Sequence, residues 1–190
     1  MAQKNTKHAK SPEIHSEAEL QPYVDTVGAA AHRAMTALIL PSQGLPYLHK
    51  MKFDPIGYDP LDITRRINVI EQINQTFTYL ASFAAAKILF GLHPNCGLRL
   101  NLGTASGSDI ESVQDGFLAA EVFAAVTPRN NKKLRKDIDK VCAAQANHRY
   151  VFYYCPNEAL SQQEHESIFE RTKVIVRAVD LKREFPSLPL

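Results

Sequence analysis

The sequence predicts an α/β fold, a three-layer mixed sheet flanked by helices, with a helical segment at its N-terminal end. Two observations predict it. Apolar residues follow helical spacing in the first half of the chain, and short strand-like runs alternate with helical ones in the second half. Strand–helix–strand steps require a parallel or mixed sheet that helices cover. A length of 190 residues suits one such domain.

The composition is that of a globular protein. Hydrophobic residues make up 45% and charged residues 22% of the chain, and the net charge of +2 is too small to indicate a nucleic-acid partner by itself. Cys96, Cys142 and Cys155 are far apart and form no CxxC pair, which favours a reducing compartment and predicts a cytoplasmic protein. No uncharged apolar run approaches the ~18 residues of a membrane span.

The first part of the chain is predicted to be a tail followed by a helix. Residues 1–15 are polar and basic without apolar periodicity, which predicts a disordered basic tail before a single domain over residues 16–190. From Ser16 onward apolar residues recur at i+3 and i+4 spacing. This pattern predicts a helix that ends at Pro41 and Gly44.

A loop and a second helix complete a helical part over residues 16–96, ahead of an α/β core over residues 97–180. Proline and glycine are dense between 41 and 60, which predicts the loop, and the apolar stripe from about Leu61 to Phe90 predicts the helix. In the core the periodicity predicts strands at 97–102, 109–113 and 117–126, a helix at 130–146, a strand at 149–155, a helix at 157–171 and a strand at 173–180.

Glu121 is the unusual residue of the long predicted strand. It is the single polar residue between Phe117 and Val126. An ionised carboxylate buried in a central strand costs several kcal/mol unless it is paired or bound to a metal. Glu121 therefore calls for a functional or electrostatic explanation.

The preceding turn places a second acid beside Glu121. Gln114-Asp115-Gly116 suits a three-residue hairpin loop that ends in a left-handed glycine, and counting outward from it pairs Asp109 with Glu121. Two carboxylates about 5 Å apart at Cβ repel each other unless a cation lies between them. A two-residue loop, Asp115-Gly116, would instead turn Asp109 to the opposite face.

A facing pair of carboxylates predicts a divalent-metal site. Mg²⁺, or Mn²⁺ in its place, takes one or two protein carboxylates together with water and phosphate oxygens of a substrate, which suits phosphodiester hydrolysis. The alternative is that Asp109 only ends the loop before it and that Glu121 pairs with Arg129 or Arg149. The sequence leaves both interpretations open.

The residues Ser108-Asp109-Ile110 and Glu121-Val122-Phe123, set in an αβββαβ order, resemble the PD-(D/E)xK restriction-endonuclease-like nuclease superfamily. The likeness covers the chain from about Leu61 to Cys155. It implies a restriction-endonuclease-like fold and a Mg²⁺-dependent endonuclease that hydrolyses DNA, with Asp109 and Glu121 as metal ligands. A homodimer is compatible with it, since many such enzymes cut both strands as dimers.

The sequence departs from this pattern at Phe123, which stands where the family has a catalytic lysine. The resemblance permits a lysine from the following helix, and Lys133, with Lys132 in reserve, is the predicted replacement because it borders the buried stripe of that helix. It also permits a further carboxylate, Glu71, from the helix before the first strand. The alternatives are a solvated basic face and a surface glutamate.

Phe123 also supports a second hypothesis for the whole protein. A chain that lacks the lysine could be a catalytically inactive nuclease-fold protein that acts as a nucleic-acid-binding or structural subunit. The two hypotheses differ in whether a divalent cation is bound and DNA is cleaved.

Overall fold

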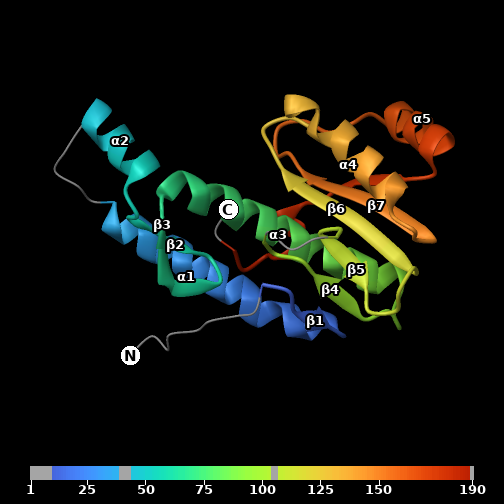
Figure 1. The fold of residues 1–190 in the computed structure, drawn as a ribbon, viewed down its shortest axis with the longest axis horizontal. Coiled ribbons are helices and arrows are strands. Elements are labelled where there is room, and N and C mark those ends of the chain that lie inside the picture. The colour runs from blue at the N-terminus through green and yellow to red at the C-terminus, as the bar shows by residue number, and fades with distance from the viewer. Residues whose placement is uncertain (1–9, 39–43, 104–106, 189–190) are drawn as a thin grey trace.

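The computed structural model describes residues 10–38, 44–103 and 107–188 of this chain (Figure 1). It is an α/β protein in which a six-stranded mixed sheet packs against helices. The N-terminal part contains β1 (Glu13–Ile14), η1 (Glu17–Leu20), α1 (Gln21–Ala37), α2 (Leu45–Phe53), β2 (Gly57–Asp59), β3 (Asp62–Ile67) and α3 (Val69–Leu92). The rest contains β4 (Leu98–Leu100), β5 (Ile110–Ser112), β6 (Leu118–Ala124), η2 (Asn130–Lys132), α4 (Lys133–Ala143), β7 (His148–Tyr154), α5 (Gln162–Thr172), β8 (Ile175–Ala178) and α6 (Leu181–Glu184).

The predicted tail overlaps a short strand. Residues 1–9 lie outside the described residues, but Glu13 and Ile14 pair antiparallel with β4, and Ile14 is buried. Pro41, one of the predicted helix stops, also lies outside the described residues. Within them, the first helix ends at Ala37. Ordered structure therefore begins before residue 16, because the apolar side chain of Ile14 joins the core.

Two predictions between residues 41 and 67 were wrong. The predicted loop contains helix α2. Pro46 lies in the first turn of this helix, where a backbone N–H has no partner within the helix and its absence costs nothing. The predicted long helix starts late, because residues 62–67 form β3, which pairs with β2 as a two-stranded sheet. Helix α3 begins only after Asn68, whose side chain accepts a hydrogen bond from Glu71 N.

The predicted strands of the core are confirmed, with boundaries that differ by a few residues. The six-stranded sheet has the order β1-β4-β5-β6-β7-β8. The pairs β1–β4, β4–β5 and β5–β6 are antiparallel, whereas β6–β7 and β7–β8 are parallel. Helices α4 and α5 connect the parallel strands, so α3-β4-β5-β6-α4-β7 follows the predicted αβββαβ order.

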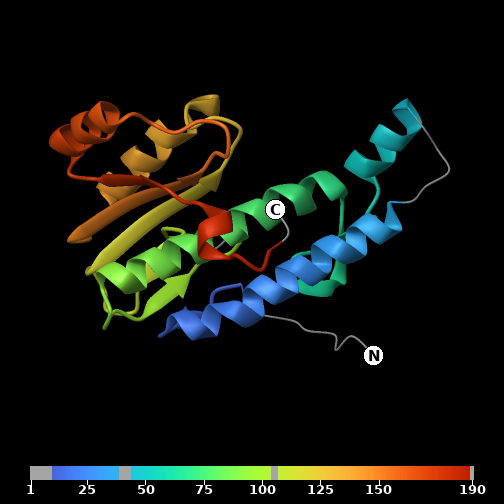
Figure 2. The same ribbon diagram turned by 180° about the vertical axis from the view of Figure 1, so that it is seen from behind.

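Helices cover both faces of the sheet and create two cores. Helices α1 and α3 lie side by side against one face, as Figure 2 shows from behind, and α4 and α5 lie against the other. Alternate residues of β6 divide between them: Ala120 and Val122 face α3, whereas Ala119 and Phe123 face α4. Glu121 thus belongs to the α4 face.

No helix in the described ranges is long and apolar enough to cross a membrane.

The β5–β6 turn gives the first prediction. Gly116 has φ +73°, a region that other residues adopt at a cost of about 1–2 kcal/mol, and a Cβ there would lie 3.3 Å from Gln145 O. Gly116→Ala should lower the free energy of unfolding by that amount, and Gly116→Asn by less, in urea titrations. Gly91→Ala, in helix α3 with open space around its Cβ, should be neutral or stabilising. Equal losses at both glycines would contradict the turn assignment.

Candidate active site

The β5–β6 hairpin brings the two predicted acids together. Ile110 pairs with Ala120 and Glu111 with Ala119, and one further step of this register places Asp109 opposite Glu121. The register is the predicted one, with Gly116 ending the loop in the left-handed conformation. The two-residue loop, which would have separated the acids, is excluded.

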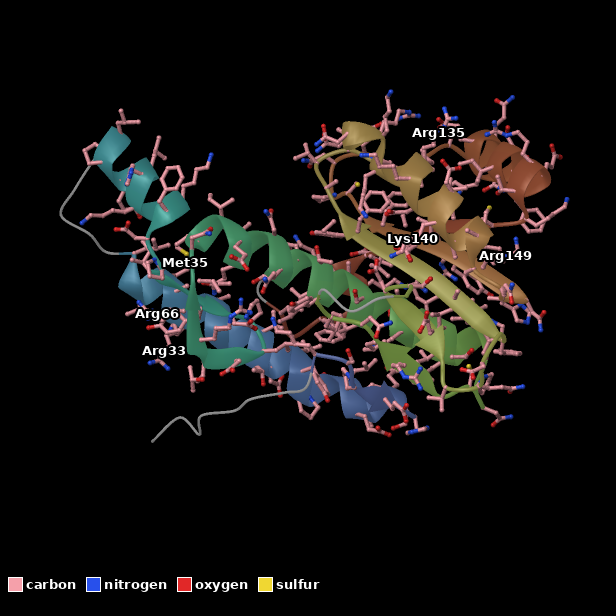
Figure 3. The ribbon with its side chains drawn as sticks, in the orientation of Figure 1. Arg33, Met35, Arg66, Arg135, Lys140 and Arg149 are labelled. Atoms are coloured by element: carbon pink, nitrogen blue, oxygen red, sulfur yellow. The ribbon has the colours of Figure 1, made fainter. Side chains whose placement is uncertain are left out.

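Asp109 and Glu121 are held by different partners. Val122 N donates to Asp109 Oδ2 at 2.8 Å, so the carboxylate is fixed against the backbone of β6. Glu121 is only 1% exposed, and its Oε2 accepts a hydrogen bond from Lys140 Nζ at 2.8 Å. Lys140 makes this contact from α4, which packs on the same face of β6; its position on α4 is labelled in Figure 3.

A third acid lies close to this pair. Asp137 of α4 is 3% exposed and its Oδ1 accepts from Lys133 Nζ at 2.7 Å. The second carboxylate oxygens, Glu121 Oε1 and Asp137 Oδ2, are buried and have no hydrogen-bond partner among the residues that the structure describes. A buried carboxylate oxygen without a partner is costly, and a proton, a water molecule or a cation would each relieve that cost.

The electrostatics of the cluster follow from burial and crowding. Burial raises the pKa of Glu121 from 4.5 to about 7, the charge of Asp109 adds to the increase, and Lys140 opposes it. Burial also raises the pKa of Asp137, against the effect of Lys133. Burial alone would lower the pKa of Lys140, but the contact with Glu121 outweighs it and the pKa is raised. Lys140 is therefore a stable ammonium beside a carboxyl group that titrates near neutrality.

The lysines predicted from the sequence are not the ones on Glu121. Lys133 contacts Asp137, and Lys132 is exposed, with a left-handed backbone at φ 59° where α4 begins. Neither arginine of the alternative interpretation pairs with Glu121. Arg129 binds Glu158 and Glu164 (two ion pairs), and Arg149 donates to the carbonyl of Ala146.

Glu71 lies on the other side of Asp109. It is in the first turn of α3, partly buried, and accepts a hydrogen bond from Gln75 Nε2 at 2.9 Å. Glu71 and Asp109 line the same cavity, which has a volume of about 410 Å³. The structure thus groups Asp109 with Glu121 on the sheet and with Glu71 across this cavity.

Lys140 and Asp137 are the site residues that the sequence reasoning missed. Lys133, Asp137 and Lys140 recur at i, i+4 and i+7, each one residue before a member of the buried stripe Leu134, Ile138 and Val141. The argument that selected Lys133 as bordering the core therefore selects all three. The sequence does not give the direction in which the helix crosses the sheet. That direction decides which turn of α4 lies above Glu121.

The carboxylates of Asp109 and Glu121 are ligands that suit a hard divalent cation, but they do not form a complete metal-binding cage. In the described ranges, no group of three or more His, Cys, Asp or Glu side chains is arranged to hold a metal ion by itself. Mg²⁺ needs no such cage, because it binds through one or two carboxylates plus water and substrate phosphate. Asp109 and Glu121 are two such carboxylates, and Glu121 Oε1 has no partner in the described ranges.

Comparisons with protein-family models, with curated proteins and with solved structures found no match to this chain. Its function must therefore be inferred from its own residues.

The raised pKa of Glu121 predicts a pH-dependent stability. A carboxyl group that titrates near 7 when folded and near 4.5 when unfolded stabilises the fold fully below pH 4.5, and this stabilisation is lost as the pH rises through 7. Glu121→Gln should remove this loss. The free energy of unfolding should fall between pH 5 and pH 8 in the wild-type protein. This fall should be larger than in the variant by up to about 3 kcal/mol.

Chemical denaturation at both pH values measures this difference. Asp139→Asn is the matched control, because Asp139 is an exposed acid of the same helix with a 73% exposed side chain. If wild type and Glu121→Gln change in parallel between the two pH values, Glu121 does not titrate in this range.

Proposed function

We propose that this chain is a metal-dependent, endonuclease-like phosphodiesterase of the restriction-endonuclease-like fold, with DNA as its substrate. The observation that carries the proposal is the facing pair of Asp109 and Glu121, with Glu121 Oε1 buried and unpartnered. Like charges at opposing positions of two strands are unfavourable without a cation, and, beyond the larger effect of burial, the charge of Asp109 does raise the pKa of Glu121. Mg²⁺ or Mn²⁺ held by Asp109 and Glu121 would supply a Lewis acid for a phosphate oxygen and lower the pKa of water.

Lys140 supports the proposal because it brings an ammonium group to Glu121. The resembling family has a lysine for this purpose at the position where this chain has Phe123. Phe123 is buried against α4 and cannot carry charge. Lys140 provides an ammonium group at Glu121 from the neighbouring helix, and its side chain is 49% exposed. In hydrolysis of a phosphodiester, water attacks phosphorus and a P–O bond breaks, so negative charge grows on the phosphoryl oxygens. A fixed cation at this position stabilises that charge.

The rival function, a catalytically inactive nuclease-fold subunit, also has an observation in its favour. Lys140 already neutralises one oxygen of Glu121. If this ion pair is the permanent partner of Glu121, the protein needs no metal and its sheet acts only as a scaffold. Metal binding and cleavage separate the two functions.

The proposal predicts metal-dependent cleavage that requires both acids. Purified protein with Mg²⁺ or Mn²⁺ should convert supercoiled plasmid to nicked or linear DNA, and Asp109→Asn or Glu121→Gln should lower the rate at least about 100-fold. Asp139→Asn should cleave like wild type. The same metals should raise the melting temperature of wild type and not of Asp109→Asn.

An unchanged melting temperature of wild type at millimolar Mg²⁺ and Mn²⁺, together with intact plasmid, would favour the inactive subunit. Cleavage that survives in both acid variants would point to a contaminating nuclease.

Lys140 gives a separate prediction. Lys140→Met should lower the cleavage rate by about 10²–10³-fold, because it removes a cation preset where charge develops. Lys136→Met, at an exposed position of the same helix, should retain activity. Lys133→Met should affect the rate less than Lys140→Met, since Lys133 contacts Asp137 and not Glu121. Rate constants from single-turnover assays with saturating protein would compare the three variants, and a larger loss at Lys133 would reassign the lysine.

A further inference from the structure

The cavity beside Asp109 has a cationic wall that the proposed chemistry does not use. It is lined by residues from three regions: the segment at Lys10, the β2–β3 hairpin with Arg65, and helix α3 with Glu71. The loop between β4 and β5 closes it with Asn101 and Asp109. Apart from Leu102 and Gly103, every lining residue has a polar or charged side chain.

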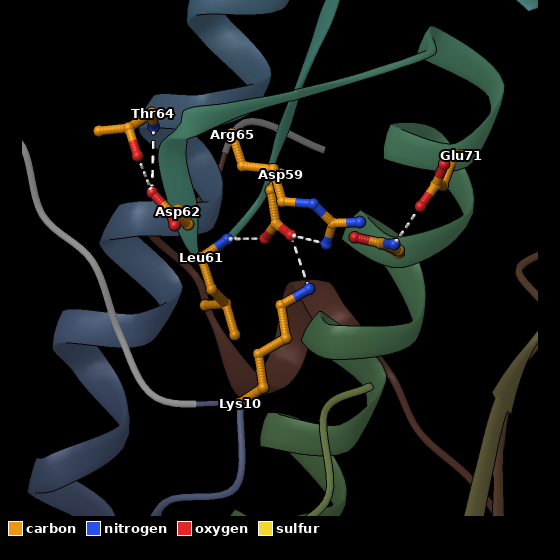
Figure 4. Close-up of polar contacts among 8 residues, drawn as sticks. Lys10, Asp59, Leu61, Asp62, Thr64, Arg65 and Glu71 are labelled. Carbon is orange, nitrogen blue, oxygen red and sulfur yellow. Dashed lines mark hydrogen bonds and ion pairs between the residues drawn. The ribbon is translucent and has the colours of Figure 1, made fainter. Parts of the chain in front are cut away.

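Lys10 and Arg65 are fixed by one buried acid. Asp59 is 0% exposed, and its Oδ2 accepts from both Lys10 Nζ at 2.6 Å and Arg65 Nη1 at 3.0 Å. Its Oδ1 accepts from Leu61 N at 3.0 Å. Figure 4 shows the two cations converging on this carboxylate, with Glu71 on α3 across from them. Asp59 thus holds the cations in place and is itself shielded from the cavity.

Both cations keep donors free for a ligand. An ammonium group has three N–H donors and a guanidinium has five, and the contact with Asp59 uses one from each. The side chain of Lys10 is 33% exposed and that of Arg65 is 54% exposed. Two cations share one carboxylate, so this wall retains a positive charge.

The backbone connects this wall rigidly to the acids. Leu102 N donates to Lys10 O at 2.6 Å, and Asn101 N donates to Asp109 O at 2.8 Å. Asn101 Nδ2 also donates to Ser108 O at 2.7 Å. Lys10 and Asp109 are therefore positioned by the same short segment after β4. The lining of the cavity thus carries two cations, Lys10 and Arg65, and two acids, Glu71 and Asp109.

We infer that Lys10 and Arg65 form a subsite for a phosphate of the nucleic-acid strand, next to the phosphodiester that the acids would engage. The inference rests on the proposed function for its substrate class. A bare anion would be repelled by Glu71 and Asp109 in the same lining, whereas a chain of phosphates can place one group on the cations and the next near the acids. Arg65 supplies the forked donors that suit phosphate oxygens.

The test is equilibrium binding of a fluorescently labelled oligonucleotide, single-stranded or duplex, by anisotropy, using full-length Asp109→Asn protein in EDTA so that no cleavage occurs. In this background Lys10→Gln and Arg65→Gln should each weaken binding about 3- to 10-fold. Each should also reduce the slope of log K against log salt by about 0.7 for a single strand or 0.9 for a duplex.

Two further variants separate phosphate contact from loss of folding. Arg65→Lys keeps the charge and should keep the salt slope, even if it binds less tightly. Arg66→Gln removes the same charge one residue further along β3, where Arg66 stacks on Tyr58 and lies outside the cavity lining. It should leave the slope unchanged. Melting temperatures measured in parallel show whether each variant is folded.

Binding that Lys10→Gln and Arg65→Gln leave unchanged, or that Arg66→Gln weakens equally, would overturn the subsite. Stabilisation by inorganic pyrophosphate that depends on Arg65, without any oligonucleotide binding, would overturn its assignment to a strand. Arg65-dependent binding by a protein whose wild type never cleaves DNA with Mg²⁺ or Mn²⁺ would uphold the subsite and refute the proposed enzymatic activity, so the two failures are distinguishable.

Discussion

The arrangement of the site depends on the register of the β5–β6 hairpin. Gly116 ends its loop with φ +73°, and this turn places Ile110 opposite Ala120. A shift by one residue would reverse the faces of one strand relative to the other and separate Asp109 from Glu121. The conformation of one glycine in the turn thus helps to determine that Asp109 lies opposite Glu121.

That shared face carries an electrostatic cost which α4 offsets in part. Glu121 and Asp137 are almost fully buried, and Lys140 and Lys133 each satisfy one of their oxygens. Two buried carboxylate oxygens remain without partners in the described part of the chain. A cluster built only for stability would be better served by apolar side chains of similar size. The two buried carboxylate oxygens that lack partners are therefore the feature that favours a functional explanation.

The sequence predicted those parts of the molecule that periodicity controls. Alternation along residues 97–102 predicted β4, and the short segment 109–113 and the apolar run 117–126 predicted β5 and β6. The chemistry of the turn between them predicted the β5–β6 register. The strand at Asp62–Ile67 was mistaken for helix because Ile63 and Ile67 are spaced four apart, a spacing that also suits a helix, and only Asn68 marks where α3 begins. Lys140 was missed because periodicity gives the angle of a side chain around its helix but not which turn lies over Glu121.

The N-terminal part of the chain supplies two cations, Lys10 and Arg65, to the cavity that Asp109 also lines. The sheet face around Asp109 is acidic, and without α4 it would repel any phosphate. Asp59 of the β2–β3 hairpin draws Lys10 and Arg65 to the edge of the same cavity, and Gln72 joins this hairpin to α1 by bonding Tyr58 N and Ala30 O. The carbonyl oxygen of Lys10 also accepts a hydrogen bond from Leu102 N, next to Asn101, whose N–H donates to Asp109 O. The helical part is thus better described as one wall of the site than as a separate appendage.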